Sequence, residues 1–142
     1  MPQLFRLRPL ALALLLSAST VAGAQGNNSY VEGLEDSIAA YTVSDFASHG
    51  PQPDGFRHVK LRFRETDTGT RSYLLCGQVH IGTGAKAEWA DFATIKTDPY
   101  EQWLGGPAAD MCAKATPVTG GRDLAPLLEQ QLGPKASQPT AP

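Results

Sequence analysis

The sequence predicts a small α+β protein. We expect an antiparallel sheet of about three strands, packed by an N-terminal helix and short C-terminal helices and held by one disulfide. Three observations support this class: an apolar stripe with helical spacing after residue 29, two alternating segments joined by turn residues, and a pair of cysteines. The first two are the periodic signals of a helix and a hairpin, and the third suits an exported chain.

The first 24 residues have the design of a secretory signal peptide. Arg6 and Arg8 precede an apolar run, and the small residues Ala22, Gly23 and Ala24 follow it, which matches the basic, apolar and cleavage regions of such a peptide. The run is far shorter than the ~20 residues that span a bilayer. We expect cleavage after Ala24, one domain over residues 25–133, no transmembrane segment after cleavage, and a periplasmic or secreted protein.

Charge and motifs bound the chemistry. Removing residues 1–24 takes away two of the 12 basic residues and none of the 14 acidic ones, so the net charge changes from −2 to 10 − 14 = −4. A mildly acidic chain of this size gives no reason to expect nucleic-acid binding. The Gly-x-Gly of Gly82 to Gly84 lacks the rest of a dinucleotide fingerprint, so we expect no cofactor.

Cys76 and Cys112 are the two cysteines of the chain. In an oxidising compartment a single disulfide is the default, and closing a loop of ~36 residues stabilises a domain by about 4 kcal/mol. The alternatives are a reactive Cys76 paired with His80, or a metal site. Four residues along a strand separate these two side chains by about 13 Å, too far for direct proton transfer. Because the histidines show no metal-ligand spacing, we expect no metal and assign no catalytic residue.

The first helix is predicted by an apolar stripe between Tyr30 and Tyr41. Its members are separated by three, four and three residues, and acidic residues occupy the rest of the wheel. Ser29 stands before the stripe with Glu32 three residues later, which matches a capping box. We expect an amphipathic helix that covers a sheet. The stripe consists of Val31, Leu34, Ile38 and Tyr41.

Two strands and a turn follow. Glycine and proline are concentrated in residues 48–55, which predicts a loop. Residues 56–65 alternate, residues 66–70 supply turn residues, and residues 71–81 are rich in β-forming residues. We therefore predict an antiparallel hairpin. Gly77 inside the second strand predicts a bulge or a close approach by another backbone.

The rest of the chain predicts one more strand and short helices. Glycine and proline again separate the segments, and proline is tolerated in the first turn of a helix. The C-terminal composition is that of a disordered tail. We expect, in order, a strand over residues 87–96, a helical turn over 100–104, a helix from Pro107 through Cys112, a helix within 122–133 with Pro126 in its first turn, and a disordered tail over 134–142.

A basic face is the candidate binding surface. Alternation in the first strand turns Val59, Leu61 and Phe63 to one side and basic side chains to the other. Aligned charges of this kind can steer an acidic partner. The alternative is that they form a solvated strand face protected by charge from edge pairing. The candidate residues are His58, Lys60, Arg62 and Arg64, joined across the hairpin by Arg71.

The order of these segments also resembles a known group of proteins. Cys76, Gly77 and Val79 lie between a loop bearing proline and aspartate and a glycine-containing turn, with an aromatic strand and Cys112 beyond. This is similar to small exported, mostly uncharacterised bacterial proteins with a C-G-x-V-N motif, over residues 51–112. His80 stands where those proteins usually have Asn. The resemblance implies the α+β fold and the bridge and carries no activity.

Three functions follow as hypotheses. The first is a non-enzymatic binding protein of inhibitor or immunity type, whose partner is another periplasmic or secreted protein. The second is an envelope hydrolase, because carboxylates beside aromatic side chains are typical of sugar-cleaving sites. The third is a polyanion or membrane-surface binder acting through the basic face, with strongly salt-dependent association. The carboxylates of the second hypothesis are Glu88, Asp91, Asp98 and Glu101, near Trp89 and Trp103.

Overall fold

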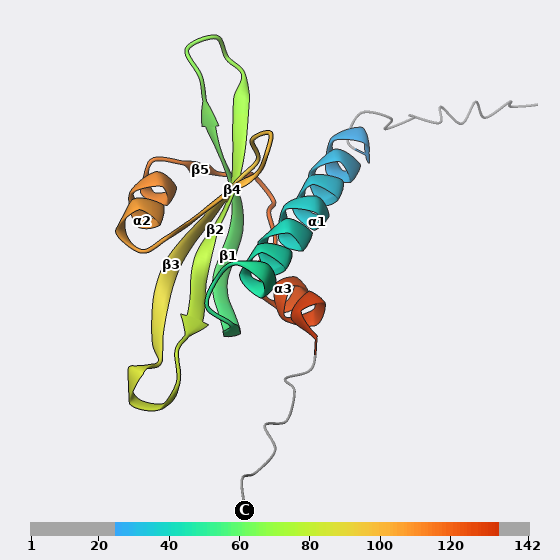
Figure 1. The fold of residues 1–142 in the computed structure, drawn as a ribbon. Coiled ribbons are helices and arrows are strands. Elements are labelled where there is room, and N and C mark those ends of the chain that lie inside the picture. Colours follow the sequence, from blue (N-terminus) through green and yellow to red (C-terminus); the bar gives the residue numbers. More distant parts are fainter. Residues whose placement is uncertain (1–24, 134–142) are drawn as a thin grey trace, which may run out of the picture.

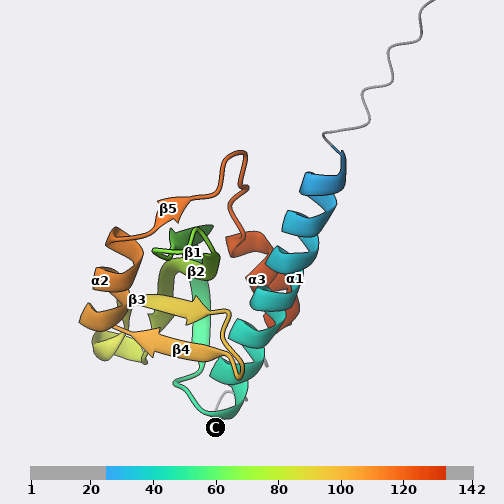
Figure 2. The same cartoon turned by 90° about the horizontal axis from the view of Figure 1, so that it is seen from above.

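The computed structural model describes residues 25–133. The signal peptide predicted for residues 1–24 and the tail predicted for residues 134–142 lie outside this range. Within it, one antiparallel sheet is covered by α1 and α3 on one side and by α2 on the other (Figure 1, Figure 2). The α+β class is therefore confirmed. None of the helices in residues 25–133 is long and apolar enough to cross a membrane.

The sheet has five strands in the order β4-β3-β2-β1-β5, so the prediction of about three was too low. The predicted hairpin and third strand are present, as are α2 and α3 with Pro107 and Pro126 in their first turns. The elements are α1 Gln25–Ser48, β1 Pro53–Glu65, β2 Arg71–Ile81, a 3-10 helix Gly84–Lys86, β3 Glu88–Ile95, β4 Glu101–Leu104, α2 Gly106–Ala113, β5 Thr116–Pro117 and α3 Ala125–Leu132.

β4 corrects the helical turn predicted for residues 100–104. It pairs with β3, placing Leu104 beside Phe92 and Gln102 beside Thr94, and the Thr94 hydroxyl donates to the side-chain oxygen Oε1 of Gln102 at 3.1 Å. Four residues are too few for the alternation of apolar and polar side chains to identify a strand in the sequence. The conformation of this segment is determined by its pairing with the neighbouring strand. The same holds for β5, whose two residues pair with Arg62 and Phe63 of β1.

α1 is longer than predicted. It begins at Gln25, so Ser29 lies inside the helix and the predicted capping box is wrong. Its buried side carries Leu34, Ile38 and Phe46, and Phe46 packs against the rings of Phe56 and Phe92 with centroids 6.0 and 5.9 Å away. This aromatic cluster is the centre of the core that α1 and α3 form with the sheet.

Further along α1, Tyr41 stacks on Tyr100, and its hydroxyl donates to the Tyr100 carbonyl oxygen at 2.9 Å. Desolvation and, second, the negative charge of Asp45 raise the pKa of Tyr41 above its ordinary value of 10.0. The hydroxyl is therefore a stable donor at physiological pH, and it ties the middle of α1 to the segment that leads into β4.

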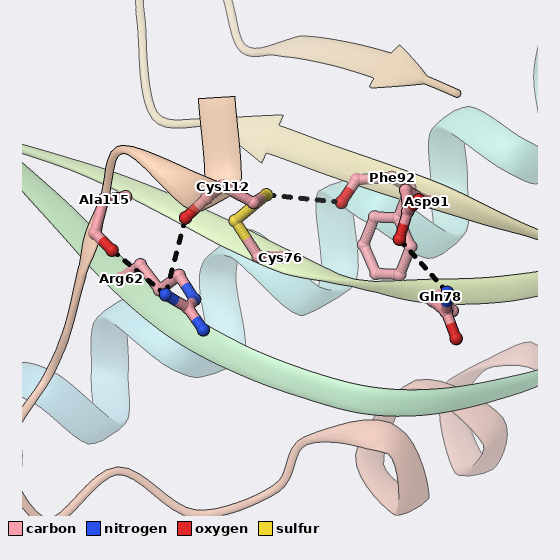
Figure 3. Close-up of a disulfide and its surroundings, with 7 residues drawn as sticks. All are labelled: Arg62, Cys76, Gln78, Asp91, Phe92, Cys112 and Ala115. Atoms are coloured by element: carbon pink, nitrogen blue, oxygen red, sulfur yellow. Dashed lines mark hydrogen bonds between the residues drawn. A yellow bond between two sulfur atoms is a disulfide. The ribbon is translucent and has the colours of Figure 1, made fainter. Parts of the chain in front are cut away.

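The disulfide between Cys76 and Cys112 is confirmed, with the sulfur atoms 2.05 Å apart and the Cα atoms 5.8 Å apart. It joins α2 to β2 (Figure 3). Cys112 Sγ also lies 3.8 Å from the Phe92 carbonyl oxygen, but a disulfide sulfur carries no hydrogen, so this is a contact and not a hydrogen bond. Leu74, Ile95 and Met111 pack around the bridge as a second, smaller core.

A bulge interrupts β1. The register shifts between Arg57 and Lys60, and His58 has a φ of 54°, the left-handed conformation that L-residues seldom adopt. Gly77 is the reason that the strands can still pack closely: a Cβ there would lie 2.8 Å from Val59 Cγ2 and 3.0 Å from Val59 Cα. The prediction of a close backbone approach at Gly77 is confirmed.

The C-terminal segment completes the edge of β1 beside the bulge. The backbone amide of Val59 donates to Asp123 Oδ1 at 3.1 Å, and that of Phe56 donates to Glu129 Oε1 at 3.2 Å. Leu124 returns a hydrogen bond from its own amide to the Val59 carbonyl oxygen at 2.8 Å. Backbone groups that lack a strand partner are thus satisfied by the segment that leads into α3.

Candidate functional site

The candidate site lies on the side of the sheet opposite α1, which we call the outer face. Cross-strand partners share a face, so the register arranges this face in rows. α2 lies over the rows of Cys76 and Leu74, whereas the ends of β1, β2 and β3 near the 3-10 helix extend beyond it (Figure 1). The uncovered rows are Gly55, His80 and Trp89, and next to them Arg57, Gln78 and Asp91.

Trp89 lies at the centre of the uncovered part, with 38% of its surface exposed. The guanidinium carbon of Arg57 lies 4.1 Å from the ring centroid, and the His80 ring centroid lies 4.9 Å away. The indole reaches across β2 to Gly55 of β1, where a Cβ would lie 3.5 Å from Trp89 Cη2, an ordinary van der Waals distance. An arginine over a tryptophan face is a favourable cation–π contact.

Hydrogen bonds fix the side chains around this ring. Arg57 Nε donates to Gln78 Oε1 at 2.8 Å, and Gln78 Nε2 donates to Asp91 Oδ1 at 3.2 Å (Figure 3). His80 Nδ1 contacts Asp54 Oδ1. We call Arg57, Gln78, His80, Trp89 and Asp91 the Trp89 patch.

A hollow of about 330 Å³ adjoins the Trp89 patch where α2 meets the sheet. Gln78 and Asp91 form its boundary with the patch, and Arg62 and the disulfide lie on its other sides (Figure 3). Its remaining lining residues are His58, Gly77 and Ala113. This lining holds one carboxylate and neither a hydroxyl nor a free thiol. Within residues 25–133 no group of three or more metal-ligating side chains is found.

The structure places the five predicted basic residues in different settings. Lys60 and Arg64 are exposed on β1, and His58 lines the hollow from the bulge. Arg62 Nη1 donates to the carbonyl oxygens of Cys112 and Ala115, at 3.4 and 3.0 Å. Arg62 therefore binds the C-terminal end of α2, where a cation interacts favourably with the helix dipole. Its Nε is buried without a hydrogen-bond partner among the described residues.

Arg71 is not on the outer face. It pairs with Glu65, one residue beyond the row of Arg64 and Ser72, and its guanidinium carbon lies 4.1 Å from the Phe63 ring centroid on the side of α1. Arg57 takes its place on the outer face, although strict alternation groups Arg57 with Val59 on the buried side. The bulge at His58 moves the Arg57 side chain to the other face of β1. Gly77 was the single residue in the sequence that indicated a bulge.

The four carboxylates of the hydrolase hypothesis are divided between β3, which carries Glu88 and Asp91, the turn that holds Asp98, and β4, which begins with Glu101. Glu88 and Asp91 lie near the start of β3, and Glu101 pairs with Ile95 at the end of that strand. Seven residues separate Glu88 from Ile95, or about 23 Å of strand. Trp103 donates from Nε1 to Glu101 Oε2 at 3.2 Å, far from the Trp89 patch. The four groups are therefore not brought together as a catalytic set.

No family model, curated protein or solved structure matches the chain.

Proposed function

We propose that the chain is an exported, non-enzymatic binding protein of inhibitor or immunity type, which holds an acidic protein partner on the outer face of its sheet. The observation that carries this proposal is Trp89, an exposed indole in contact with Arg57 and His80 on the part of the sheet that α2 leaves uncovered. The predicted signal peptide and the disulfide support a periplasmic or secreted location.

The composition of the Trp89 patch suits a protein interface. Tryptophan and arginine are the side chains most enriched among residues that dominate binding energy. Their hydrogen bonds and ring contacts hold them in one arrangement before binding, which lowers the conformational entropy lost on association. The adjoining hollow offers room for a side chain of the partner.

Charge along β1 supports an acidic partner. Arg57, Lys60 and Arg64 are exposed on this strand, and they share the outer face by the register of the hairpin. A column of like charge increases the rate of encounter with a surface of opposite sign. The separation of the four carboxylates over β3, β4 and the turn between them and the composition of the hollow support a non-enzymatic role.

The proposal is tested by replacing Trp89 and comparing the result with a second exposed tryptophan. Trp103 is 43% exposed and provides the matched control. The tagged protein is used to capture partners from envelope extract of the producing cell; the captured protein is identified, purified and titrated against each variant. Trp89→Ala is expected to weaken binding about 30-fold or more, as a loss of ~2 kcal/mol implies, whereas Trp103→Ala retains it.

Binding kinetics at rising salt concentration test the role of the exposed charges on β1. The association rate is expected to fall with ionic strength for the wild type and to fall less for a variant in which Lys60 and Arg64 are replaced by glutamine. A partner that binds Trp89→Ala as tightly as the wild type contradicts the proposal.

A further inference from the structure

A second candidate site lies on the opposite side of the sheet, between the first turns of α1 and the outer part of the hairpin. A hollow of about 460 Å³ is lined there by Tyr30 from α1 and by Phe63, Arg71 and Tyr73 from the hairpin. Asn28 and Thr116 add polar groups. No aspartate or glutamate is among its lining residues, so Arg71 gives the hollow a positive charge.

Arg71 is held in place with its donors available. Its guanidinium carbon lies 4.1 Å from the Phe63 ring centroid. Within residues 25–133 it forms no hydrogen bond and no ion pair, and its strand neighbour Glu65 does not approach it within salt-bridge distance. A guanidinium has five donors in a planar fork that fits a carboxylate. The arrangement therefore offers an anion site that needs little reordering.

Tyr30 forms the wall between this hollow and another. Its side chain is 60% exposed, and its ring meets that of Tyr73 edge to face, with centroids 6.4 Å apart. The neighbouring hollow, of about 370 Å³, is lined by Tyr30, Ser37 and Lys96 among others. Tyr30 lines both hollows, the first of which contains Arg71 and the second Lys96. We call these two hollows together the Tyr30 groove.

We propose that the Tyr30 groove binds an acidic oligosaccharide, with sugar carboxylates at Arg71 and Lys96 and a sugar ring across Tyr30. The C–H face of a pyranose packs well on a flat aromatic ring, and its hydroxyls need partners that both donate and accept. Tyrosine and threonine hydroxyls and the asparagine amide have that double capacity, and they line the groove beside the two cations.

The same features make an acidic peptide a poorer fit. A peptide brings backbone groups that pair best with a free strand edge, whereas the strand edge beside this groove is that of β5, whose two residues include Pro117, which has no amide hydrogen. Two cations alone would accept any polyanion. The exposed ring between them gives selectivity for a ligand with alternating apolar faces and carboxylates, so Tyr30 is the residue that separates the proposal from general anion attraction.

The test is calorimetric titration of the purified secreted protein with three probes of equal length. These are tetragalacturonate, the neutral maltotetraose and a tetraglutamate peptide. Tetragalacturonate is expected to bind at least tenfold more tightly than either of the others. Arg71→Gln is expected to weaken it about tenfold or more, since a hydrogen-bonded charge pair is lost, and Tyr30→Ala by a similar factor, while Tyr30→Phe retains most of the affinity.

Arg64→Gln is the matched control, because Arg64 lies on the neighbouring strand with its side chain on the outer face. It is expected to leave tetragalacturonate binding unchanged, as is Trp89→Ala, which separates this site from the proposed protein interface. The inference is overturned if tetragalacturonate does not bind. It is also overturned if tetraglutamate binds equally well and Tyr30→Ala has no effect, which would mark a general anion site.

Discussion

Gly77 shows how one residue controls the geometry of the outer face. It lies opposite the bulge of β1, and a Cβ at this position would lie 3.0 Å from Phe92 Cε1 as well as 2.8 Å from Val59 Cγ2. Neither neighbour is the free end of a flexible chain, since both belong to the buried core. The bulge therefore depends on the absence of a side chain, and with it the outward position of Arg57.

Gly77→Ala is expected to lower the free energy of unfolding by ~1–3 kcal/mol, the typical effect of overpacking a core. Gly33→Ala in α1 is the control: a Cβ there meets nothing within 4 Å, and alanine favours a helix by up to about 1 kcal/mol over glycine. Denaturant unfolding of both variants measures the difference. Equal stability of Gly77→Ala and the wild type would show that the strands are not in close contact there.

At the scale of elements, α2 is the one whose position depends most on a covalent link. It is eight residues long and packs on the sheet through the small core around the disulfide. Arg62 binds the carbonyl oxygens at and beyond its C-terminal end. Isolated helices of this length are unstable in water, so these contacts and the bridge together keep α2 on the sheet.

Replacing both cysteines by alanine is expected to lower the free energy of unfolding by about 4 kcal/mol, as the loop of 36 residues implies. Hydrogen exchange of the α2 amides is expected to accelerate more than that of the α1 amides, because the core of α1 does not include the bridge. Mass spectrometry of the two helices measures this contrast. Uniform acceleration over both helices would mean that the bridge stabilises the whole fold and not α2 in particular.

The elements that could be predicted from the sequence are those with a pattern of their own. The hairpin follows from alternation on either side of a turn, and α1 and α3 from apolar stripes. β4 and β5 have four and two residues and form because β3 and β1 offer them partners. The start of α1 was missed because a good capping residue, Ser29, can also lie within a helix when residues before it continue the same backbone conformation.

At the scale of the whole molecule, the sheet separates two surfaces that the sequence could not assign. Lys60, Arg62 and Arg64 lie on one face of β1, as their alternation predicts. Arg71 was placed on the wrong side, because its face depends on the register set by the turn at residues 66–70. Arg57 was missed because the bulge reverses its parity. The sequence predicted for Trp89 only a place beside the carboxylates of the hydrolase hypothesis. Its contact with Arg57 was missed because the two residues are 32 positions apart and no local pattern indicates the contact.

The most direct test of the central claim, that the uncovered outer face holds a protein partner, is photo-cross-linking in the producing cell. A photoreactive phenylalanine analogue replaces Lys60, exposed on the outer face of β1, or Glu32, exposed on α1. We expect a discrete cross-linked protein from position 60 that disappears when Trp89→Ala is added, and none of that mass from position 32. The same adduct from both positions, or one at position 60 that survives Trp89→Ala, would contradict the account.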